Sequence, residues 1–301
     1  MPSHACRSLR GRQRGMAVIV AMLVVAIVAV MAAALLTRQA AALRTLRSEQ
    51  LRAQVDMAVD AALEQAGVQL REDARGQLAT VLQGRWAQPL QLQAPLPVRL
   101  QLVDAQGLFN LRNLLKDGRP DGAAGQAFQQ LCNAQGLAPG ECGQAQAFLQ
   151  ARLRDGERAA LAPLPREEAL ALALPGSDPA AVLALARRTV VLPAHTLINA
   201  NTSDVSLLQA SAAGIAPARV KALLDERDQG RWFANRGDIA NRLRLTDLQM
   251  ERVPWGIHSE WFLAVGEVQA DARRVDFRAL IWREYRDDEV RVQRVWTRVG
   301  A

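Results

Sequence analysis

The sequence predicts an α+β fold in which a long N-terminal helix, a small antiparallel sheet and a large helical insert follow one another. Three observations predict it. A proline-free, largely apolar stretch opens the chain, and strand-like alternation occurs only near residue 100 and again after residue 259. Between those strands, apolar residues recur at helical spacing and are interrupted by proline and glycine. The strands must therefore meet across the insert to form one sheet.

The composition is that of a folded protein and excludes several functional classes. Of 301 residues, 50% are apolar and 22% charged, which rules out a disordered chain. The net charge of +7 includes four arginines in the first fifteen residues, so the remainder carries only +3. That remainder has no obvious basic stripe for nucleic acid. The three cysteines and three histidines lack zinc-site spacing, so a zinc enzyme is not expected.

Residues 16–36 form an uninterrupted apolar run of 21 uncharged positions. At about 1.5 Å per residue, a helix of this length spans roughly the 30 Å of a membrane's hydrocarbon core. The preceding arginines predict that residues 1–15 stay in the cytoplasm and that the rest lies outside. A signal peptide cleaved near residues 32–34 and a plain signal anchor are two interpretations of this run.

A third interpretation concerns the boundary itself. The sequence RQRG followed by MAVIV resembles a type IV prepilin leader, which is cut after the glycine, here Gly15, so that the mature chain begins at Met16. Pilins usually carry glutamate at the fifth mature position, which here is Val20. A carboxylate in the membrane costs several kcal/mol unless it is paired. Its absence therefore suits a subunit at a filament tip better than a repeating shaft subunit.

The long helix is predicted to continue beyond the apolar run. From Thr37 to about Leu82 there is no proline, and apolar residues recur at helical spacing. A separate helix after a short break is the alternative. Prolines at 89, 95 and 97 end the pattern, and residues 98–103 alternate as a half-buried strand.

The segment 104–118, DAQGLFNLRNLLKDG, is predicted to be a structural turn without a nucleophile and its base. Gly107 is available for a positive φ there, while Asn110 and Asn113 can cap backbone groups. The residues expected to be buried are Phe109, Leu111 and Leu114.

Residues 121–190 are predicted to form several short helices separated by proline and glycine. Cys132 and Cys142 flank a Gly/Pro loop in this region. Outside the cytoplasm a disulfide between them is plausible, and two small buried apolar residues are the alternative. Cys6 lies in the leader and has no partner.

A second helical unit is predicted over residues 196–245, with Thr202 or Ser203 as the N-cap of its first helix. After residue 259 the pattern changes to strands, and the last two are expected to form a hairpin through residues 286–288.

The second helical unit also supplies a rival function, a membrane-anchored helix-hairpin-helix module that binds nucleic acid in the manner of DNA-uptake receptors. The hairpin residues 214–217 read Gly-Ile-Ala-Pro, so an alanine replaces a glycine and Pro217 lacks an N–H donor for phosphate. The neighbouring cations are matched by acids. A packing module is favoured. An enzyme is a distant third, because His195 and His258 have no neighbouring catalytic set.

Several pieces in order resemble the type II secretion minor pseudopilin K family, also called general secretion pathway protein K. They are RQRG with MAVIV, DAQGLFNLRNLL, a large helical insert, INANTSDVSLLQA, ERDQGRWFANRGDI and SEWFLAVGEV. The resemblance implies a pilin-like helix and sheet with an all-α insert of SAM-like or helix-hairpin-helix-like units. The implied division is 1–15 leader, 16–36 transmembrane or filament helix, 37–119 pilin-like helix and first strand, 120–250 insert and 251–301 final strands.

The resemblance also implies a role in assembly without catalytic residues. A prepilin peptidase would cleave between Gly15 and Met16, and Met16 would be N-methylated. The chain would then join minor pseudopilins I and J, with other pseudopilins, at the pseudopilus tip. It would be anchored once in the inner membrane with its C-terminal domain in the periplasm, and no nucleic acid is an expected partner. Family members bind calcium, and Asp117 and Asp121 supply oxygens, but no ligand or certain cofactor is assigned.

Overall fold

The computed structural model describes residues 13–76, 79–159, 166–212, 214–286 and 289–300. Its contacts divide the chain into two units, residues 1–56 and residues 57–301, and each is considered by itself. Most of the predicted leader, residues 1–12, lies outside the described residues.

Helix α1 (Gln13–Gly76) supplies all of the described part of the first unit. It is the one described helix that is long and apolar enough to cross a membrane, and its most apolar window has no buried residue. The membrane-length helix predicted from residues 16–36 is therefore confirmed.

The end of α1 corrects the predicted helix, which was expected to reach about Leu82. The helix ends at Gly76, and the chain from Ala79 is not helical. There the Thr80 N–H donates to the Ile257 carbonyl at 2.9 Å, and Thr80 Oγ1 accepts from the Ser259 N–H at 3.0 Å. The helical pattern was overridden because residues 79–81 contact the segment that leads into the final strands.

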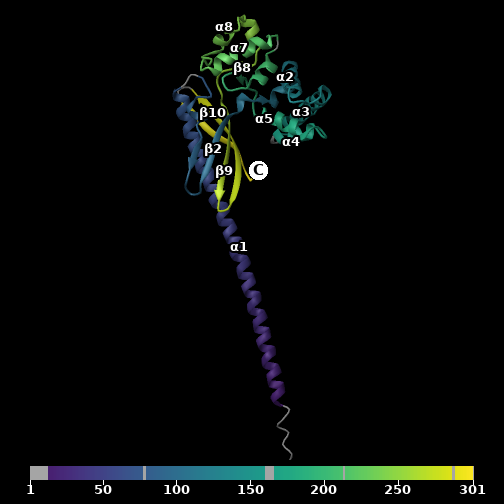
Figure 1. Cartoon of the computed structure of the whole chain (residues 1–301), viewed down its shortest axis with the longest axis vertical. Coiled ribbons are helices and arrows are strands. Elements are labelled where there is room, and N and C mark those ends of the chain that lie inside the picture. Colours follow the sequence, from purple (N-terminus) through teal and green to yellow (C-terminus); the bar gives the residue numbers. More distant parts are fainter. Residues whose placement is uncertain (1–12, 77–78, 160–165, 213, 287–288, 301) are drawn as a thin grey trace, which may run out of the picture. The chain divides into compact units, whose positions relative to one another are not determined.

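The second unit contains a five-stranded antiparallel sheet in the order β1-β2-β9-β10-β11 (Figure 1). Its strands are β1 (Leu90–Leu92), β2 (Val98–Asp104), β9 (Trp261–Ala270), β10 (Arg273–Arg286) and β11 (Glu289–Val299). The first predicted strand and the three C-terminal ones are thus confirmed. β2 pairs with β9 from Val98↔Val268 to Asp104↔Phe262, so the two ends of the unit close one sheet. The predicted hairpin pairs β10 with β11, and its residues 287 and 288 lie outside the described part of the chain.

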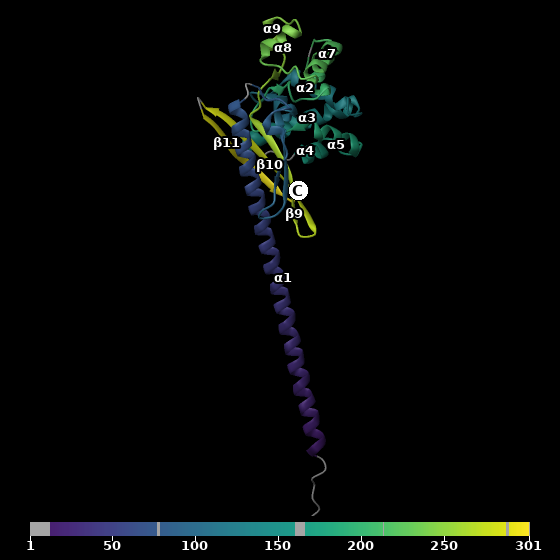
Figure 2. The same cartoon turned by 60° about the vertical axis from the view of Figure 1, so that its left-hand side comes forward.

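Residues 57–76 of α1 lie beside β10 and β11 on one face of the sheet (Figure 2). A Cβ placed on Gly67 would lie 3.6 Å from Val292 of β11, and Asp73 pairs with Arg283 of β10. The buried apolar stripe of this stretch is Val59, Ala62, Leu63, Ala66 and Leu70. Its spacing of three and four residues is the amphipathic pattern predicted for the outer part of the helix.

The opposite face of the sheet packs on the beginning of the helical region. Trp261 and Trp282 stack there with ring centroids 5.7 Å apart. The apolar cluster on this face contains Ala105, Val190, Leu192, Trp261, Leu263 and Leu280. The sheet therefore lies between α1 residues 57–76 and the chain that carries the insert.

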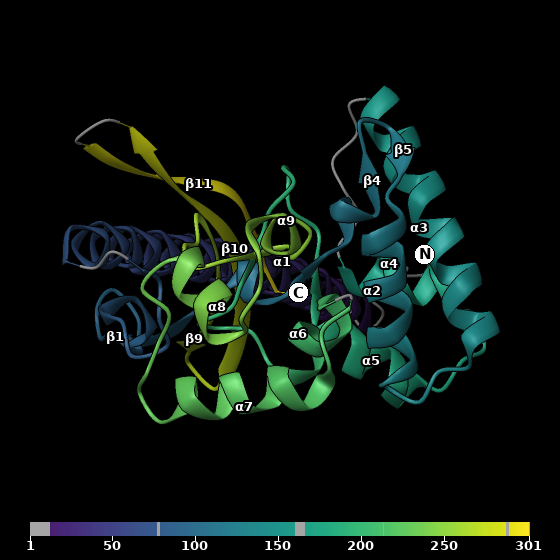
Figure 3. The same cartoon turned by 90° about the horizontal axis from the view of Figure 1, so that it is seen from above.

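In the described part of the chain, eight helices lie between β2 and β9, in two successive groups. The first group is α2 (Gly122–Asn133), α3 (Pro139–Ala159), α4 (Arg166–Ala173) and α5 (Pro179–Arg187). The second is α6 (Val205–Ser211), α7 (Pro217–Asp228), α8 (Arg236–Arg242) and α9 (Asp247–Glu251). α6 of the second lies beside α2 and α5 of the first (Figure 3). Both groups share one apolar core, which includes Phe128 and Leu131 of the first and Leu224 and Ile239 of the second.

Short elements join these helices to the sheet. The parallel pairs are β3 (Phe109–Asn110) with β6 (Thr189–Val190) and β7 (Ile198–Asn199) with β8 (Trp255–Gly256). The antiparallel pair is β4 (Leu115–Lys116) with β5 (Arg119–Pro120). The 3-10 turns are η1 (Arg85–Ala87), η2 (Ala105–Gly107) and η3 (Leu111–Leu114).

Two local expectations in this region were wrong. Gly107 does not have a positive φ; a Cβ there would lie 2.9 Å from Thr202 Oγ1, so glycine is needed for a close approach. The N-cap of α6 is Asp204, whose side chain accepts from the Leu207 N–H, rather than Thr202 or Ser203. Other details were right: Phe109, Leu111 and Leu114 are buried, and Asn110 caps η3.

Candidate functional site

The predicted processing boundary lies inside α1. Gly15 and Met16 are both within the helix, and Val20 follows one turn after Met16. The Met16 side chain is 67% exposed and that of Val20 is 54% exposed. Cleavage after Gly15 and methylation of Met16 stay predictions.

The side chains after this boundary are apolar on every side of the helix. Successive residues turn by about 100°, and the exposed run Val18, Ile19 and Val20 already covers three directions. The same exposure continues through Leu35 and Leu36. A helix that is apolar all round is typical of a membrane span or of the interior of a large assembly.

A second notable region is a buried polar cluster in the folded unit, centred on Asp104 at the end of β2. Its carboxylate accepts hydrogen bonds from Gln106 N at 2.8 Å, Asn199 Nδ2 at 2.9 Å, Thr202 Oγ1 at 2.6 Å and Ser259 Oγ at 2.6 Å. Burial raises the pKa of Asp104, while these four hydrogen bonds act in the opposite direction.

A buried ion pair adjoins Asp104. Arg283 Nη1 lies 3.0 Å from Asp73 Oδ2, and their side chains are 1% and 2% exposed. Arg283 Nη2 also donates to Thr80 Oγ1 at 2.9 Å and to the Ser259 carbonyl at 2.8 Å. The guanidinium carbon lies 4.7 Å from the centre of the Phe262 ring. The charge is thus paired, both terminal nitrogens are hydrogen-bonded and the guanidinium is stacked, while the buried Nε has no hydrogen-bond partner among the described residues.

Asn199 connects the hydrogen bonds of Asp104 with the residues that surround the buried ion pair. Its Nδ2 group donates to the Thr80 carbonyl at 3.1 Å and to Ser259 Oγ at 2.8 Å, in addition to Asp104. We call the connected set the junction network; it consists of Asp73, Thr80, Asp104, Asn199, Thr202, Ser259 and Arg283. It joins α1, β2, β10 and the start of the second helical group. The helical region is therefore fixed on the sheet by polar contacts as well as by its apolar core.

Sequence reasoning singled out the segments that hold this network but did not predict a buried polar cluster there. INANTSD and SEWF appeared only as pieces of a family pattern, and Thr202 was expected to cap a helix. The available signal was a set of small polar residues placed among strongly apolar neighbours. Such residues favour caps and turns by local rules, so the long-range partners were not visible.

The hairpin of the rival function has its cations engaged within the protein. Gly214 has a φ of +81°, and Pro217 begins α7. Lys221 pairs with Asp225 at 2.7 Å, and the buried Arg227 donates to the carbonyls of Ala200 and Ser203. Arg219 donates to the Leu243 carbonyl. These cations serve packing, so nucleic-acid binding is not favoured.

The cysteine pair and the neighbouring acidic loop lie in the first helical group. A disulfide joins Cys132 of α2 to Cys142 of α3, with the Cα atoms 5.9 Å apart. The Asp121 carboxylate caps α2 by accepting from the Ala124 N–H at 2.8 Å. Among the residues that the structure describes, no group of three His, Cys, Asp or Glu side chains is placed to hold a metal ion. No calcium ligand is therefore assigned to Asp117 or Asp121.

The two histidines considered earlier are not part of a catalytic arrangement in the described ranges. The pKa of His258 is lowered, first by burial and then by the nearby Arg283 charge. Neither ring forms a side-chain hydrogen bond with a described residue, and His195 is exposed.

Two comparisons with known proteins bear on this arrangement. Residues 198–255 match the family model described as type II secretion system (T2SS), protein K. That segment holds Asn199 and Thr202 of the junction network together with the 214–217 hairpin. No curated protein matched the sequence.

A solved structure shares the fold. It is the crystal structure of the GspK-GspI-GspJ complex from the type 2 secretion system of enterotoxigenic Escherichia coli. A chain of that structure matches with a TM-score of 0.66 and 19% identity, over 85% of the present chain and 99% of its own. The mixed architecture of a long N-terminal helix and an antiparallel sheet is thus a known one. Together the two matches confirm the predicted resemblance to minor pseudopilin K.

Proposed function

We propose that this chain, a relative of the type II secretion minor pseudopilin K, is a subunit of the pseudopilus tip. It helps to start the filament and caps it for the export of folded proteins. The observation that carries the proposal is the all-apolar, exposed surface of residues 16–36, which continues without a break in α1 toward a folded unit. The apolar surface of such a helix is covered by lipid while the subunit is in the membrane and by the helices of other subunits once it is in the filament.

The folded unit supports a capping role through its insert. Residues 37–119 and 251–301 supply the helix and sheet of a pilin-like domain, and residues 120–250 supply a helical insert with SAM-like or helix-hairpin-helix-like units. An insert of this size between the first and second long strands occupies volume that a shaft subunit has to leave free for its neighbours. Growth beyond such a subunit is therefore blocked.

The partners proposed for this chain are those of the similar structure. That structure is a complex of GspK with GspI and GspJ. The chain would join minor pseudopilins I and J through its apolar helix, after a prepilin peptidase has cut between Gly15 and Met16. The inner membrane holds the helix as a single pass, and the folded unit lies in the periplasm. The role is structural, without a catalytic residue.

Mass spectrometry of the mature N-terminus tests this proposal most directly. A chain that begins at N-methylated Met16 is expected in cells that contain prepilin peptidase, and residues 1–15 should be retained in cells that lack it. A mature chain that begins beyond Ala34 would contradict the proposal. DNA binding by the full chain at low salt, with a steep salt dependence, would favour the rival function instead.

Substitution of Val20 tests whether the subunit lies at the tip of the filament. Val20→Glu should leave insertion into the membrane intact and impair assembly with the partner pseudopilins, because a new carboxylate would lack a partner there. Val20→Leu is the matched control and should assemble normally. Failure of Val20→Glu to insert at all would show that the account of this position is wrong.

A further inference from the structure

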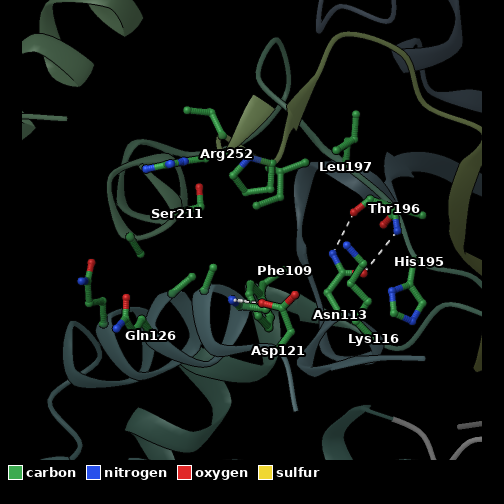
Figure 4. A pocket seen from close by; sticks show the side chains of 18 of the residues that line it. Phe109, Asn113, Lys116, Asp121, Gln126, His195, Thr196, Leu197, Ser211 and Arg252 are labelled. Carbon is green, nitrogen blue, oxygen red and sulfur yellow. Dashed lines mark hydrogen bonds between the residues drawn. The ribbon is translucent and has the colours of Figure 1, made fainter. Parts of the chain in front are cut away.

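A pocket of about 410 Å³ lies in the helical region, and no residue of the junction network lines it (Figure 4). Its walls come from residues 109–116, the beginning and middle of α2, residues 195–198, the end of α6, the start of α8 and residues 251–254. This volume is within the range of about 300–1,000 Å³ that is typical of ligand pockets. No role proposed above uses it.

The walls of the pocket are held by hydrogen bonds between their own residues. Asn113 Nδ2 donates to the Thr196 carbonyl at 2.7 Å, and the Thr196 N–H donates to Asn113 Oδ1 at 3.2 Å, as the dashed lines in Figure 4 show. On the other side, Trp255 Nε1 donates to Ser211 Oγ at 2.8 Å. The cavity is therefore preformed, which lowers the entropy lost when a ligand binds.

Part of the lining is apolar and part can hydrogen-bond to amides. The apolar lining includes Phe109, Ala124, Ala127, Ile198, Ala210 and Val253. Gln126 and Gln130 also line the pocket, and neither side chain is hydrogen-bonded to a described residue at this wall. Glutamine amides can donate and accept at once, which suits the backbone of a peptide.

Three positively charged side chains without acidic partners in the described ranges also line the pocket. Lys116, Arg236 and Arg252 line it, and none of them forms an ion pair with a residue in the described ranges. Of the two acids at the pocket, Asp121 already accepts a hydrogen bond from the α2 backbone, and Glu251 is exposed. Positive charge is therefore in excess at this pocket, and an anionic ligand is favoured.

Arg236 gives a more specific indication. Its Nη2 donates to the carbonyls of Met250 at 2.8 Å and Val253 at 3.2 Å, which fixes the guanidinium in the wall. Its Nη1 forms no hydrogen bond with a residue that the structure describes. That nitrogen is the donor left for an oxygen of a ligand.

We propose that this pocket binds the C-terminal end of an extended peptide whose last side chain is apolar. The terminal carboxylate is the acceptor that a guanidinium or ammonium group of the lining matches by charge. The apolar lining takes the last side chain, and the glutamine amides take the peptide backbone. A volume of about 410 Å³ accommodates two or three residues.

Binding to the full chain in detergent tests the proposal. The probe is a fluorescently labelled Ala-Leu-Leu tripeptide with a free C-terminal carboxylate, measured by anisotropy, and its comparison is the same peptide with a C-terminal amide. The free acid should bind at least about tenfold more tightly than the amide, because a charge-assisted hydrogen bond is lost in the amide.

Substitutions in the lining test whether the peptide binds in this pocket. Arg236→Gln should weaken binding of the free acid about tenfold, and Ala123→Phe should fill the pocket mouth from an exposed position and abolish binding. The double variant Lys116→Gln with Arg252→Gln changes only exposed side chains and tests the charge even where Arg236→Gln impairs folding. The matched control is Arg187→Gln, an exposed arginine on α5 outside the pocket, which should bind like the unaltered chain.

Three results would overturn the proposal. Equal binding of acid and amide would show that the peptide enters the detergent or an apolar surface without carboxylate recognition. Unchanged binding in the Ala123→Phe and the double variants would place the peptide elsewhere. A fatty acid that binds while the tripeptide does not would assign the pocket to a lipid carboxylate.

Discussion

Folded proteins usually have an apolar interior and a polar surface. The apolar helix of residues 16–36 and the junction network depart from this pattern in opposite directions. The helix exposes large apolar side chains such as Ile19 and Met22, at 70% and 71%. The network buries a carboxylate and an ion pair, with Arg283 only 1% exposed. The comparison separates a surface that other molecules must cover from polar groups whose hydrogen-bond and ion-pair partners lie within the chain.

The two regions therefore depend on different conditions. Each square ångström of apolar surface left in water forgoes about 25 cal/mol, so the helix is stable only in lipid or against other helices. The network needs no other molecule, but it tolerates no lost member, because a charge left unpaired in the interior is costly. The first region governs assembly, and the second governs the fold.

Blocking the release of the apolar helix from its leader should have the largest effect. Gly15→Phe places a bulky side chain at the proposed cleavage site, and we expect a full-length chain in the inner membrane and loss of secretion. Immunoblotting for chain length and an assay of secreted protein check this. Gly11→Phe, in the same leader, should be processed normally. Normal processing of Gly15→Phe would show that the leader hypothesis is wrong.

Breaking the junction network should be the next largest effect. Arg283→Met leaves Asp73 charged and unpaired in the interior, and we expect the free energy of unfolding to fall by about 3–5 kcal/mol. Urea denaturation of the full chain in detergent measures it. Adding Asp73→Leu should restore much of the loss, since both charges are then absent.

The control for this experiment is a pair on the same strand whose arginine is exposed. Arg286 lies 2.7 Å from Glu284 and its side chain is 57% exposed. Arg286→Met should cost less than about 1 kcal/mol. Equal losses for Arg283→Met and Arg286→Met would mean that the network is not important for stability.

The disulfide between Cys132 and Cys142 should contribute less. Its sequence separation is 10 residues, and a loop of that length corresponds to about 2–3 kcal/mol in the chain-entropy model. Replacing both cysteines by serine should lower the thermal midpoint, and a reductant should do the same to the unaltered chain only. A reductant effect that persists in the double variant would contradict the assignment.

The smallest expected effect is a pH dependence due to Asp104. Because burial raises its pKa in the folded state, the folded chain binds this proton more tightly than the unfolded chain does. The resulting stabilisation is complete below the ordinary pKa near 4, and it is lost as the pH rises through the raised folded-state pKa. Urea midpoints across this range should show that contribution, and Asp104→Asn should remove it. An identical pH profile for both chains would exclude Asp104 as its source.

The difference between local sequence patterns and contacts between distant residues explains how much of the molecule could be predicted from its sequence. The apolar run and the alternation of β2 and β9 to β11 are local patterns, and the structure contains those elements. Thr202 was expected to cap a helix, since hydroxyls commonly do so, but it donates to Asp104 instead and Asp204 takes the cap.

Other failures have the same cause. α1 was expected to reach about Leu82, yet it ends at Gly76. The residues near Thr80 contact a distant segment instead, and the Thr80–Ser259 hydrogen bond joins residues 179 positions apart. The pocket at Arg236 was not foreseen either, because its walls come from six separate parts of the chain. Partners that are distant in sequence leave no periodic pattern.

The pairing of β2 with β9 has a consequence for biosynthesis. Residue 98 pairs with residue 268, so the central strands cannot meet until nearly the whole polypeptide has been synthesised. The helices between them have local contacts and can form earlier. A chain that stalls before residue 261 would leave the β9 side of β2 as an unprotected edge, which makes truncated products targets for proteases and for mispairing.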